Sequence, residues 1–257
     1  MTSSDIRFIA LDLDNTLLRS DGSVSPRNVD AVEKARSGGI QPIVATARPP
    51  RKTAELLGGF LSDDPAITYS GARVRIDGQL IHEQTIELPS AQLIVERLVK
   101  RAPGARISVE IDDRLYSTLP HPAARPEDIV DVRKVLDREP VKIMLGMTHD
   151  GIPDDILEDL PSDVRCVLSD GGGLAQIMHA DVSKSGGVRR VVEELGGELE
   201  NVIAFGDDIN DLEMIRDCGI GVAMDNAVDP VKAVADRVTL SNDEDGVAVV
   251  LEELLLG

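Results

Sequence analysis

Three short polar segments follow directly after apolar runs in this chain. Asp12-Leu13-Asp14 follows residues 9–11, Thr46-Ala47-Arg48 follows residues 42–45, and Gly206-Asp207-Asp208 follows residues 202–205. Short, nearly all-apolar runs are typical of parallel strands buried on both faces. Open α/β sheets bind ligands beyond the carboxyl ends of such strands, so we expect these side chains and Lys184 to converge there. Together they could hold a phosphate and a divalent cation, which indicates phosphoryl chemistry.

The two carboxylates at the first strand end could divide the work of a phosphoryl transfer. One carboxylate, from Asp12 or Asp14, can attack phosphorus and form an aspartyl-phosphate. The other can protonate the leaving oxygen and then activate a water molecule. Taken alone, this pair could equally be a polar strand end, so the interpretation depends on the other segments.

Cationic and hydroxyl side chains near these strand ends could bind an anionic substrate. Thr46 offers a hydroxyl and Arg48 a fork of donors, and either could bind a phosphoryl oxygen. Lys184 could neutralise both Asp12 and the transferring phosphate. Separately, Thr46 could cap a helix and Lys184 could be an ordinary solvated lysine.

Three carboxylates within five residues, Asp207, Asp208 and Asp211, indicate a cation. Like charges so close are unfavourable unless a cation or solvent separates them. Mg²⁺ prefers oxygen ligands and takes few protein carboxylates. We expect Asp207 to bind the ion, and Asp208 to face solvent or cap the next helix. The alternative is an acidic helix N-terminus, which the helix dipole favours.

Composition excludes several classes of protein. The 257 residues are 42% hydrophobic and carry a net charge of -19, which argues against binding to a nucleic-acid backbone. No run approaches the ~20 apolar residues of a membrane span, and the first residues do not resemble a secretion signal. The two cysteines, Cys166 and Cys218, form no disulfide framework, so we expect a cytoplasmic protein.

The order of predicted elements indicates two domains. Strands and helices alternate through residue 83, and they alternate again from a helix at 187–195. The first part includes a helix that Ser25 can cap, with Pro26 at its first position, and a hairpin around Asp77-Gly78. Between these parts we expect helices at 90–101, 127–138 and 153–160, and strands at 106–111, 115–118, 141–147, 164–168 and 174–178. We therefore predict an α/β domain interrupted by a smaller α+β domain.

The segments together resemble the haloacid dehalogenase (HAD) superfamily, in particular its Cof-like hydrolases. The likeness covers the whole chain. It is carried by residues 8–14, Thr46-Ala47-Arg48, Lys184, residues 203–214, residues 221–227 and residues 241–247. It implies a Rossmann-like core with a parallel sheet flanked by helices, formed by residues 1–83 and 183–257. It also implies an inserted α+β cap domain at residues 84–182.

The resemblance also implies roles for single residues. The nucleophile would be Asp12, the acid and base Asp14, and the phosphate ligands Thr46, Arg48, Lys184 and Asn210. Mg²⁺ would be held by Asp12, Asp207 and the main-chain carbonyl of Asp14. Asp211 would also belong to the metal site and would orient it through water or through Lys184. Two positions depart from the family pattern: Ala47 stands where relatives usually have glycine, and Ser70 where many have asparagine.

The leading functional prediction is a Mg²⁺-dependent phosphatase for a small phosphorylated metabolite, with a sugar phosphate as the default from the family. A phosphomutase or phosphotransferase could use the same aspartyl-phosphate. A catalytically idle phosphate sensor is a weaker alternative, because the acidic and basic groups needed for catalysis are all present. A receiver-type domain is also weaker, because a long insertion separates these groups whereas receivers are compact. Specificity would lie in the inserted domain, for which we nominate Glu110, Arg114, Tyr116 and His179. We expect a monomer or homodimer.

Overall fold

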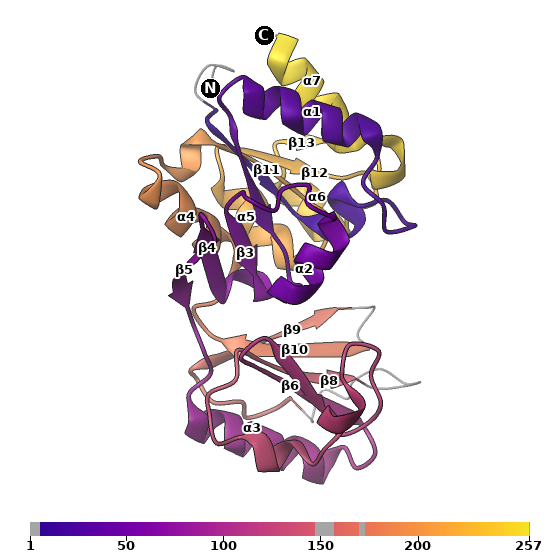
Figure 1. Cartoon of the computed structure of the whole chain (residues 1–257), viewed down its shortest axis with the longest axis vertical. Helices are drawn as coiled ribbons and strands as arrows, with labels where there is room; N and C mark the ends of the chain where they lie inside the picture. Colours follow the sequence, from indigo (N-terminus) through magenta and orange to yellow (C-terminus); the bar gives the residue numbers. More distant parts are fainter. Residues whose placement is uncertain (1–5, 147–156, 170–172, 257) are drawn as a thin grey trace. The chain divides into compact units, whose positions relative to one another are not determined.

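The chain folds into two compact units. The computed structural model describes residues 6–146, 157–169 and 173–256 (Figure 1). Unit 1 comprises Met1–Glu83 and Ser183–Gly257, and unit 2 comprises Gln84–Val182. The middle of the sequence thus forms one unit, and the two ends of the sequence form the other.

Unit 1 is built on an eight-stranded sheet in the order β13-β12-β11-β1-β2-β3-β4-β5. Neighbouring strands run parallel from β13 to β3, whereas β4 and β5 form an antiparallel hairpin. The strands are β1 Phe8–Leu11, β2 Gln41–Ala45, β3 Ala66–Thr68, β4 Arg73–Ile76, β5 Gln79–Glu83, β11 Val202–Gly206, β12 Ile220–Ala223 and β13 Arg237–Val238. The predicted α/β architecture with a parallel sheet is confirmed.

The register of the central strands aligns their carboxyl ends. All four residues of β1 are buried, as expected for a strand covered on both faces. Leu11 pairs with Val44 of β2 on one side and with Phe205 of β11 on the other. The polar residues that follow these three strands therefore emerge at the same edge of the sheet.

Helices flank this sheet, and serine side chains cap α1 and α4 at their N-termini. They are α1 Pro26–Ser37, α2 Pro50–Leu57, α4 Lys184–Glu194, α5 Leu212–Asp217, α6 Asp229–Val234 and α7 Gly246–Leu256. The Ser25 side chain caps α1 by accepting from the N–H of Asn28 at 3.0 Å. The prediction that α4 starts at residue 187 was wrong. The Ser183 side chain accepts from the N–H of Gly186 at 3.0 Å, so the helix begins at Lys184.

Unit 2 is an antiparallel sheet with a helix packed on one face. The sheet order is β7-β6-β8-β10-β9. The strands are β6 Arg106–Ile111, β7 Arg114–Ser117, β8 Lys142–Gly146, β9 Val164–Ser169 and β10 Leu174–His179, and the helix is α3 Leu88–Arg101. Ile94 and Leu98 of α3 join Val109, Ile143 and Ile177 of the sheet in one buried apolar cluster. Alternate residues of each strand face this cluster, as the antiparallel pleat requires.

The helix predicted at 127–138 is absent from unit 2. Two short 3-10 turns, Pro126–Asp128 and Val132–Val135, occupy this stretch. Between them Ile129 bridges to Ser117, and the N–H of Val130 donates to the Ser117 carbonyl at 2.9 Å. This strand-like pairing interrupts any helix, and the β-branched residues here have low helix propensity. The helix predicted at 153–160 lies mostly outside the described residues.

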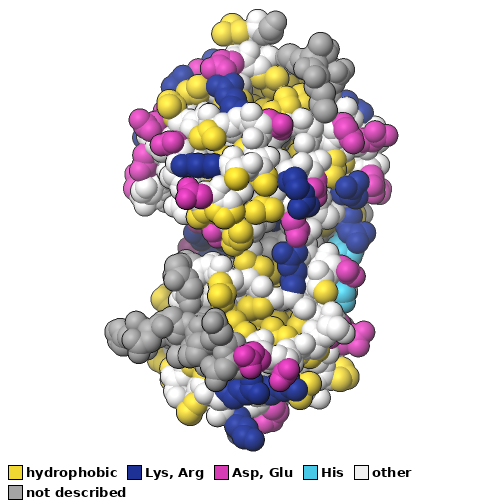
Figure 2. Space-filling model, turned by 180° about the vertical axis from the view of Figure 1, so that it is seen from behind, with side chains coloured by type: hydrophobic (Ala, Val, Ile, Leu, Met, Phe, Trp, Pro, Cys, Tyr) yellow, Lys and Arg dark blue, Asp and Glu magenta, His cyan; other side chains and the backbone are white. Residues whose placement is uncertain are grey.

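The described helices and one face of the surface can be compared with the expectations from composition. Within residues 6–146, 157–169 and 173–256, no helix is long and apolar enough to cross a membrane. On the face drawn in Figure 2, Lys and Arg side chains are interspersed with Asp and Glu rather than gathered in one field.

Candidate active site

The carboxyl end of β1 places Asp12 in the interior of unit 1. The N–H of Asp12 donates to the Phe205 carbonyl at 3.1 Å, which extends the β1–β11 pairing by one residue. Only 4% of Asp12 is exposed. The chain then enters a tight turn, Leu13–Leu17, in which Asn15 adopts a positive φ of 54°. A carboxylate so deeply buried requires nearby partners.

Lys184 is the cationic partner of Asp12. Its Nζ donates to Asp12 Oδ1 at 2.5 Å and to Asp211 Oδ1 at 2.6 Å, and all three residues are buried. Because Ser183 caps α4, Lys184 occupies the first position of that helix and is held beside the strand ends. The predicted convergence of Asp12, Lys184 and the third segment is therefore present in the structure.

The turn after β11 forms the second acidic side of the site. Asp211 Oδ2 accepts the backbone N–H groups of Asp207 and Asp208, each at 3.1 Å. A Cβ at Gly206 would lie 2.5 Å from Asp211 Cβ, so glycine is required for this close approach. Asp208 is only half-buried and contributes to the turn rather than to the acidic cluster. Asn210 is half-buried in the same turn, Ile209–Asp211.

Asp12, Asp207 and Asp211 form a cluster suited to a divalent cation. One carboxylate oxygen from each lies within 4.8 Å of those of the other two, and all three residues are buried. Both oxygens of Asp211 already accept hydrogen bonds, from Lys184 and from the turn. Asp12 Oδ2 and Asp207 Oδ2 accept none from the described residues. Asp12 and Asp207 thus each have an oxygen available to a cation, whereas Asp211 orients Lys184, and hard oxygen donors of this kind would fit Mg²⁺.

Burial and mutual repulsion make ionisation of the clustered carboxylates unfavourable. Burial raises the pKa of Asp12 well above its usual range, and the charge of Asp211 adds to this effect while Lys184 opposes it. Burial, followed by the charge of Asp211, also raises the pKa of Asp207 to about 7. Burial disfavours the Lys184 ammonium, but Asp12 and Asp211 more than offset this, so its pKa is raised. One ammonium does not balance three carboxylates, and a bound cation would relieve the difference.

Thr16 contributes to the site although the sequence analysis assigned it no role. Its Oγ1 donates to Asp207 Oδ1 at 3.2 Å, and the residue is fully buried. The hydroxyl orients one oxygen of Asp207 and leaves the other free. The only signal in the sequence was a hydroxyl residue two positions after Asp14, on a turn whose geometry was unknown.

The predicted phosphate ligands Thr46 and Arg48 lie at the end of β2. Thr46 is buried, and its Oγ1 accepts the N–H of Arg48 at 3.1 Å. The Arg48 side chain turns back to Asp14, and Arg48 Nε and Nη2 donate to both oxygens of that carboxylate. Asp14 and Arg48 thus form a separate ion pair beside the buried cluster.

Ser70, a departure from the family pattern, lies in a tight turn beside this segment. Its N–H donates to the Thr46 carbonyl at 2.9 Å, and the N–H of Tyr69 donates to the Arg48 carbonyl at 3.0 Å. Tyr69 and Ser70 both have positive φ, 52° and 59°, which is uncommon for residues other than glycine. The Ser70 hydroxyl is buried and has no hydrogen-bond partner among the described residues. Strain and an unpaired polar group in one turn are typical of functional sites.

The residues nominated for specificity all lie in unit 2, and they do not form one cluster. Glu110 is buried in β6. Arg114 forks onto the buried carboxylate of Asp128 and stacks over Tyr116, with 5.3 Å between its Cζ and the ring centroid. His179 ends β10, where its Nδ1 accepts the N–H of Asp181. Two strands separate β10 from β7 in the sheet order, so His179 is not beside Arg114.

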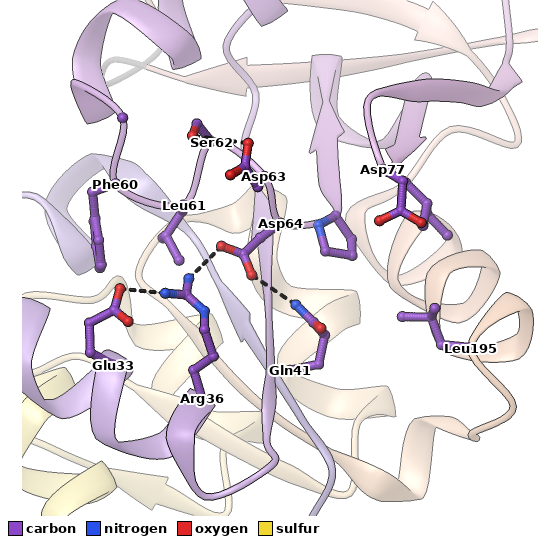
Figure 3. Close-up of a pocket in the computed structure, with 13 residues that line it drawn as sticks. Glu33, Arg36, Gln41, Phe60, Leu61, Ser62, Asp63, Asp64, Asp77 and Leu195 are labelled. Carbon is purple, nitrogen blue, oxygen red and sulfur yellow. Dashed lines mark hydrogen bonds and ion pairs between the residues drawn. The ribbon is translucent and has the colours of Figure 1, made fainter.

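A hollow in unit 1 lies at the edge of the sheet opposite to these strand ends (Figure 3). Its volume is about 350 Å³, and it is flanked by Gln41 at the start of β2 and by Asp64 just before β3. Arg36 bridges Glu33 and Asp64, and Gln41 Nε2 donates to Asp64 Oδ1 at 2.8 Å. The charges of Glu33, Arg36 and Asp64 are thus paired with one another, and ligands of open α/β sheets bind at the other edge. The candidate active site is therefore the acidic cluster at the carboxyl ends of β1, β2 and β11.

Comparison with known proteins agrees with this geometry. The family of haloacid dehalogenase-like hydrolases matches residues 9–251. The chain belongs to this family. The 5-amino-6-(5-phospho-D-ribitylamino)uracil phosphatase YcsE of Bacillus subtilis is 28% identical over 254 residues, which cover 98% of this chain and 97% of that protein. The stress response protein YhaX of the same organism is 31% identical over 269 residues, covering 96% and 92%.

Solved structures of this family share the fold. A haloacid dehalogenase-like hydrolase from Bacillus subtilis is 25% identical and superposes with a TM-score of 0.81, covering 97% of this chain and all of that one (100%). A sugar phosphatase of the superfamily is 22% identical and has a TM-score of 0.84, covering 98% and 100%. At that identity the second likeness shows the fold alone.

Proposed function

We propose that this protein is a Mg²⁺-dependent phosphatase that cleaves a small phosphorylated metabolite through an aspartyl-phosphate on Asp12. The observation that carries the proposal is the position of Asp12: its Oδ1 is held by Lys184 at 2.5 Å, and its Oδ2 accepts no hydrogen bond from the described residues. One oxygen is thus fixed while the other is available as a nucleophile. A buried carboxylate that is anchored on one side is pre-organised for attack.

The chemistry follows in two steps. In the first, an oxygen of Asp12 forms a bond to phosphorus, the bond from phosphorus to the leaving oxygen breaks, and Asp14 gives that oxygen a proton. In the second, Asp14 removes a proton from water, the water oxygen bonds to phosphorus, and the bond between phosphorus and Asp12 breaks. Orthophosphate leaves, and both carboxylates return to their starting states.

Charge stabilisation supplies most of the catalysis in such a transfer. We assign the phosphoryl oxygens to Thr46, Arg48, Lys184 and Asn210, which provide donors around the strand ends. The residues that would hold Mg²⁺ are Asp12, Asp207 and the main-chain carbonyl of Asp14, oriented by Asp211. When bound, the ion would neutralise charge on the phosphoryl group and on the carboxylates. The positive charges of Arg48, Lys184 and the ion would also allow an anionic substrate to approach a protein of net charge -19.

The substrate class is proposed from the relatives. Three Bacillus subtilis proteins that are 28%, 27% and 26% identical to this chain are named 5-amino-6-(5-phospho-D-ribitylamino)uracil phosphatases. That substrate carries its phosphate on a sugar-alcohol chain. We propose a phosphorylated sugar or sugar alcohol for this chain too, with unit 2 acting as a cap domain that supplies specificity and excludes water.

A phosphate-release assay tests the proposal. The protein is incubated with a panel of phosphorylated metabolites, with and without Mg²⁺, and with no added acceptor. We expect orthophosphate release that requires both the metal ion and Asp12. Transfer of the phosphoryl group only to an added sugar would instead indicate a phosphotransferase or mutase. Binding of phosphate compounds without turnover would indicate a sensor.

A further inference from the structure

Asp14 and Arg48 face each other in a forked ion pair. Arg48 Nε lies 3.1 Å from Asp14 Oδ1 and 2.8 Å from Oδ2, and Arg48 Nη2 lies 2.5 Å from Oδ1. A guanidinium that contacts both oxygens of a carboxylate holds it in a defined plane. Among the described residues, Arg48 makes no other ion pair.

This pairing conflicts with the roles that the proposed function gives to the two residues. Asp14 must carry a proton on one oxygen and deliver it to the leaving oxygen, yet both of its oxygens accept bonds from Arg48. Arg48 was assigned to a phosphoryl oxygen, which competes with a carboxylate for the same donors. The fork must therefore open before Asp14 can act as an acid.

The ion pair between Arg48 and Asp14 can open through side-chain movement alone, without movement of the backbone. The Arg48 N–H is bonded to Thr46 Oγ1 and the Arg48 carbonyl to the Tyr69 N–H, so the main chain is fixed at both ends of the residue. The side chains of Arg48 and Asp14 are 37% and 46% exposed, in contrast to the fully buried contacts of Lys184. Exposed ion pairs are weak and exchange readily.

We propose that Arg48 is shared between Asp14 and the substrate. In the ligand-free enzyme it holds Asp14, and when a phosphate ester binds it exchanges the carboxylate for a phosphoryl oxygen and so frees the acid for its task. The proposal rests on the proposed function, because it assigns Asp14 the proton transfer. It makes availability of the acid depend on arrival of the phosphate group.

Binding of orthophosphate tests the exchange directly. Affinity is measured by calorimetry at a fixed Mg²⁺ concentration for the wild type, Asp14→Asn, Arg48→Gln and the double variant. Because phosphate must break the fork in the wild type, Asp14→Asn should tighten binding about three- to fivefold more when Arg48 is present than in the Arg48→Gln background. An equal effect of Asp14→Asn in both backgrounds would overturn the exchange.

Steady-state kinetics separate exchange from a purely positioning role. For Arg48→Gln we expect kcat/KM to fall by a similar factor, about tenfold, for both an alkyl phosphate and p-nitrophenyl phosphate, because a charged contact to the phosphoryl group is lost. A large fall in kcat confined to the alkyl phosphate, whose leaving oxygen needs a proton, would show instead that Arg48 only positions Asp14.

The chain offers a matched control in the same unit. Arg27 forms a similar exposed fork with Glu252, through Nε at 3.0 Å and Nη2 at 2.6 Å. Arg27→Gln should leave orthophosphate affinity and kinetics unchanged. If the wild type released no orthophosphate in a reaction that depends on Asp12, the proposed function would be refuted. The binding measurements on the four proteins report on the exchange alone.

Discussion

Lys184 Nζ lies 2.5 Å from Asp12 Oδ1, although 172 positions separate the two residues in the chain. The insertion of unit 2 accounts for most of that separation. Lys184 also contacts Asp211, so a single ammonium links the end of β1 to the turn after β11. Removing either carboxylate would leave the ammonium underpaired in a buried site, which is costly.

Asp12 is expected to be indispensable for phosphate release. Asp12→Asn keeps the shape of the side chain but removes the anionic nucleophile, so kcat should fall on the order of 10⁴-fold. Orthophosphate release from the best substrate of the panel is the measurement, and circular dichroism checks the fold. A folded variant that keeps more than a few per cent of the wild-type rate would contradict the covalent mechanism.

Asp207 and Asp208 are expected to differ in their effect on the metal ion. Asp207 is buried beside Asp12 in the acidic cluster, whereas Asp208 is half-buried outside it. Asp207→Ala should raise the Mg²⁺ concentration needed for half-maximal activity by about 10- to 100-fold or abolish activity, while Asp208→Ala should change it little. Mg²⁺ titrations of both variants provide the comparison, and equal losses would remove the assignment of Asp207 as a ligand.

Metal affinity is expected to depend on pH because protons compete for the same carboxylate. The pKa of Asp207 is raised to about 7, so in the metal-free protein below that pH a proton must leave before the ion binds. The Kd for Mg²⁺ should therefore fall as the pH rises through about 7, by about tenfold per pH unit for each ligand carboxylate that must lose a proton. Calorimetric titrations across this range measure it. An affinity that does not vary with pH would show that Asp207 does not bind the proton.

The same group links pH to stability. The pKa of Asp207 is about 7 in the folded state and has its ordinary value of 3.8 in the unfolded state. Between these two pH values the folded state therefore binds more protons than the unfolded state. The contribution of Asp207 to the free energy of unfolding therefore decreases as pH rises from about 4 to 7 in the absence of metal. Denaturant unfolding with a chelator, compared with Asp207→Asn, should reveal this trend. Saturating Mg²⁺ should reduce it, since bound metal holds the carboxylate ionised.

Gly71 is expected to tolerate no side chain, because it lies against the start of α4. Its φ is 115°, and a Cβ there would lie 2.1 Å from the Ser183 carbonyl oxygen. Gly71→Ala should destabilise unit 1 by more than about 2 kcal/mol and displace Lys184, lowering activity. Gly39 is the matched control: its φ is 89°, but a Cβ there would meet no described atom within 4 Å, so Gly39→Ala should cost only about 1 kcal/mol. Similar losses in both variants would show that the contact with Ser183 is unimportant.

Residues of unit 2 are expected to change substrate preference rather than the chemical step. Tyr116→Ala and Arg114→Ala should reorder kcat/KM across the metabolite panel while leaving cleavage of a small generic ester within about twofold of the wild type. Arg114 pairs with buried Asp128, so Asp128→Asn serves as a control for loss of stability. A uniform loss on every substrate, the small ester included, would refute this division of roles.

Much of the framework could be predicted from local patterns. Apolar runs followed by Asp12, Thr46 and Asp207 predicted buried parallel strands with polar residues at one edge, and the hairpin at Asp77-Gly78 followed from turn chemistry. The helix at 127–138 was wrong because the pairing of Ser117 with Ile129 is a contact between segments distant in sequence. Periodicity within a short window carries no information about such a contact.

The sequence by itself predicted that the polar groups after β1, β2 and β11 meet at one edge of the sheet, because ligand sites of open α/β sheets lie beyond the carboxyl ends of parallel strands. Only the tertiary structure decided how those groups pair: Lys184 with both Asp12 and Asp211, Thr16 with Asp207, and Arg48 with Asp14. These pairings depend on side-chain conformations and on distances of a few ångströms between segments far apart in the chain. Residue types and spacing cannot specify those distances, since each charged group had several partners within reach until the folded backbone fixed their positions.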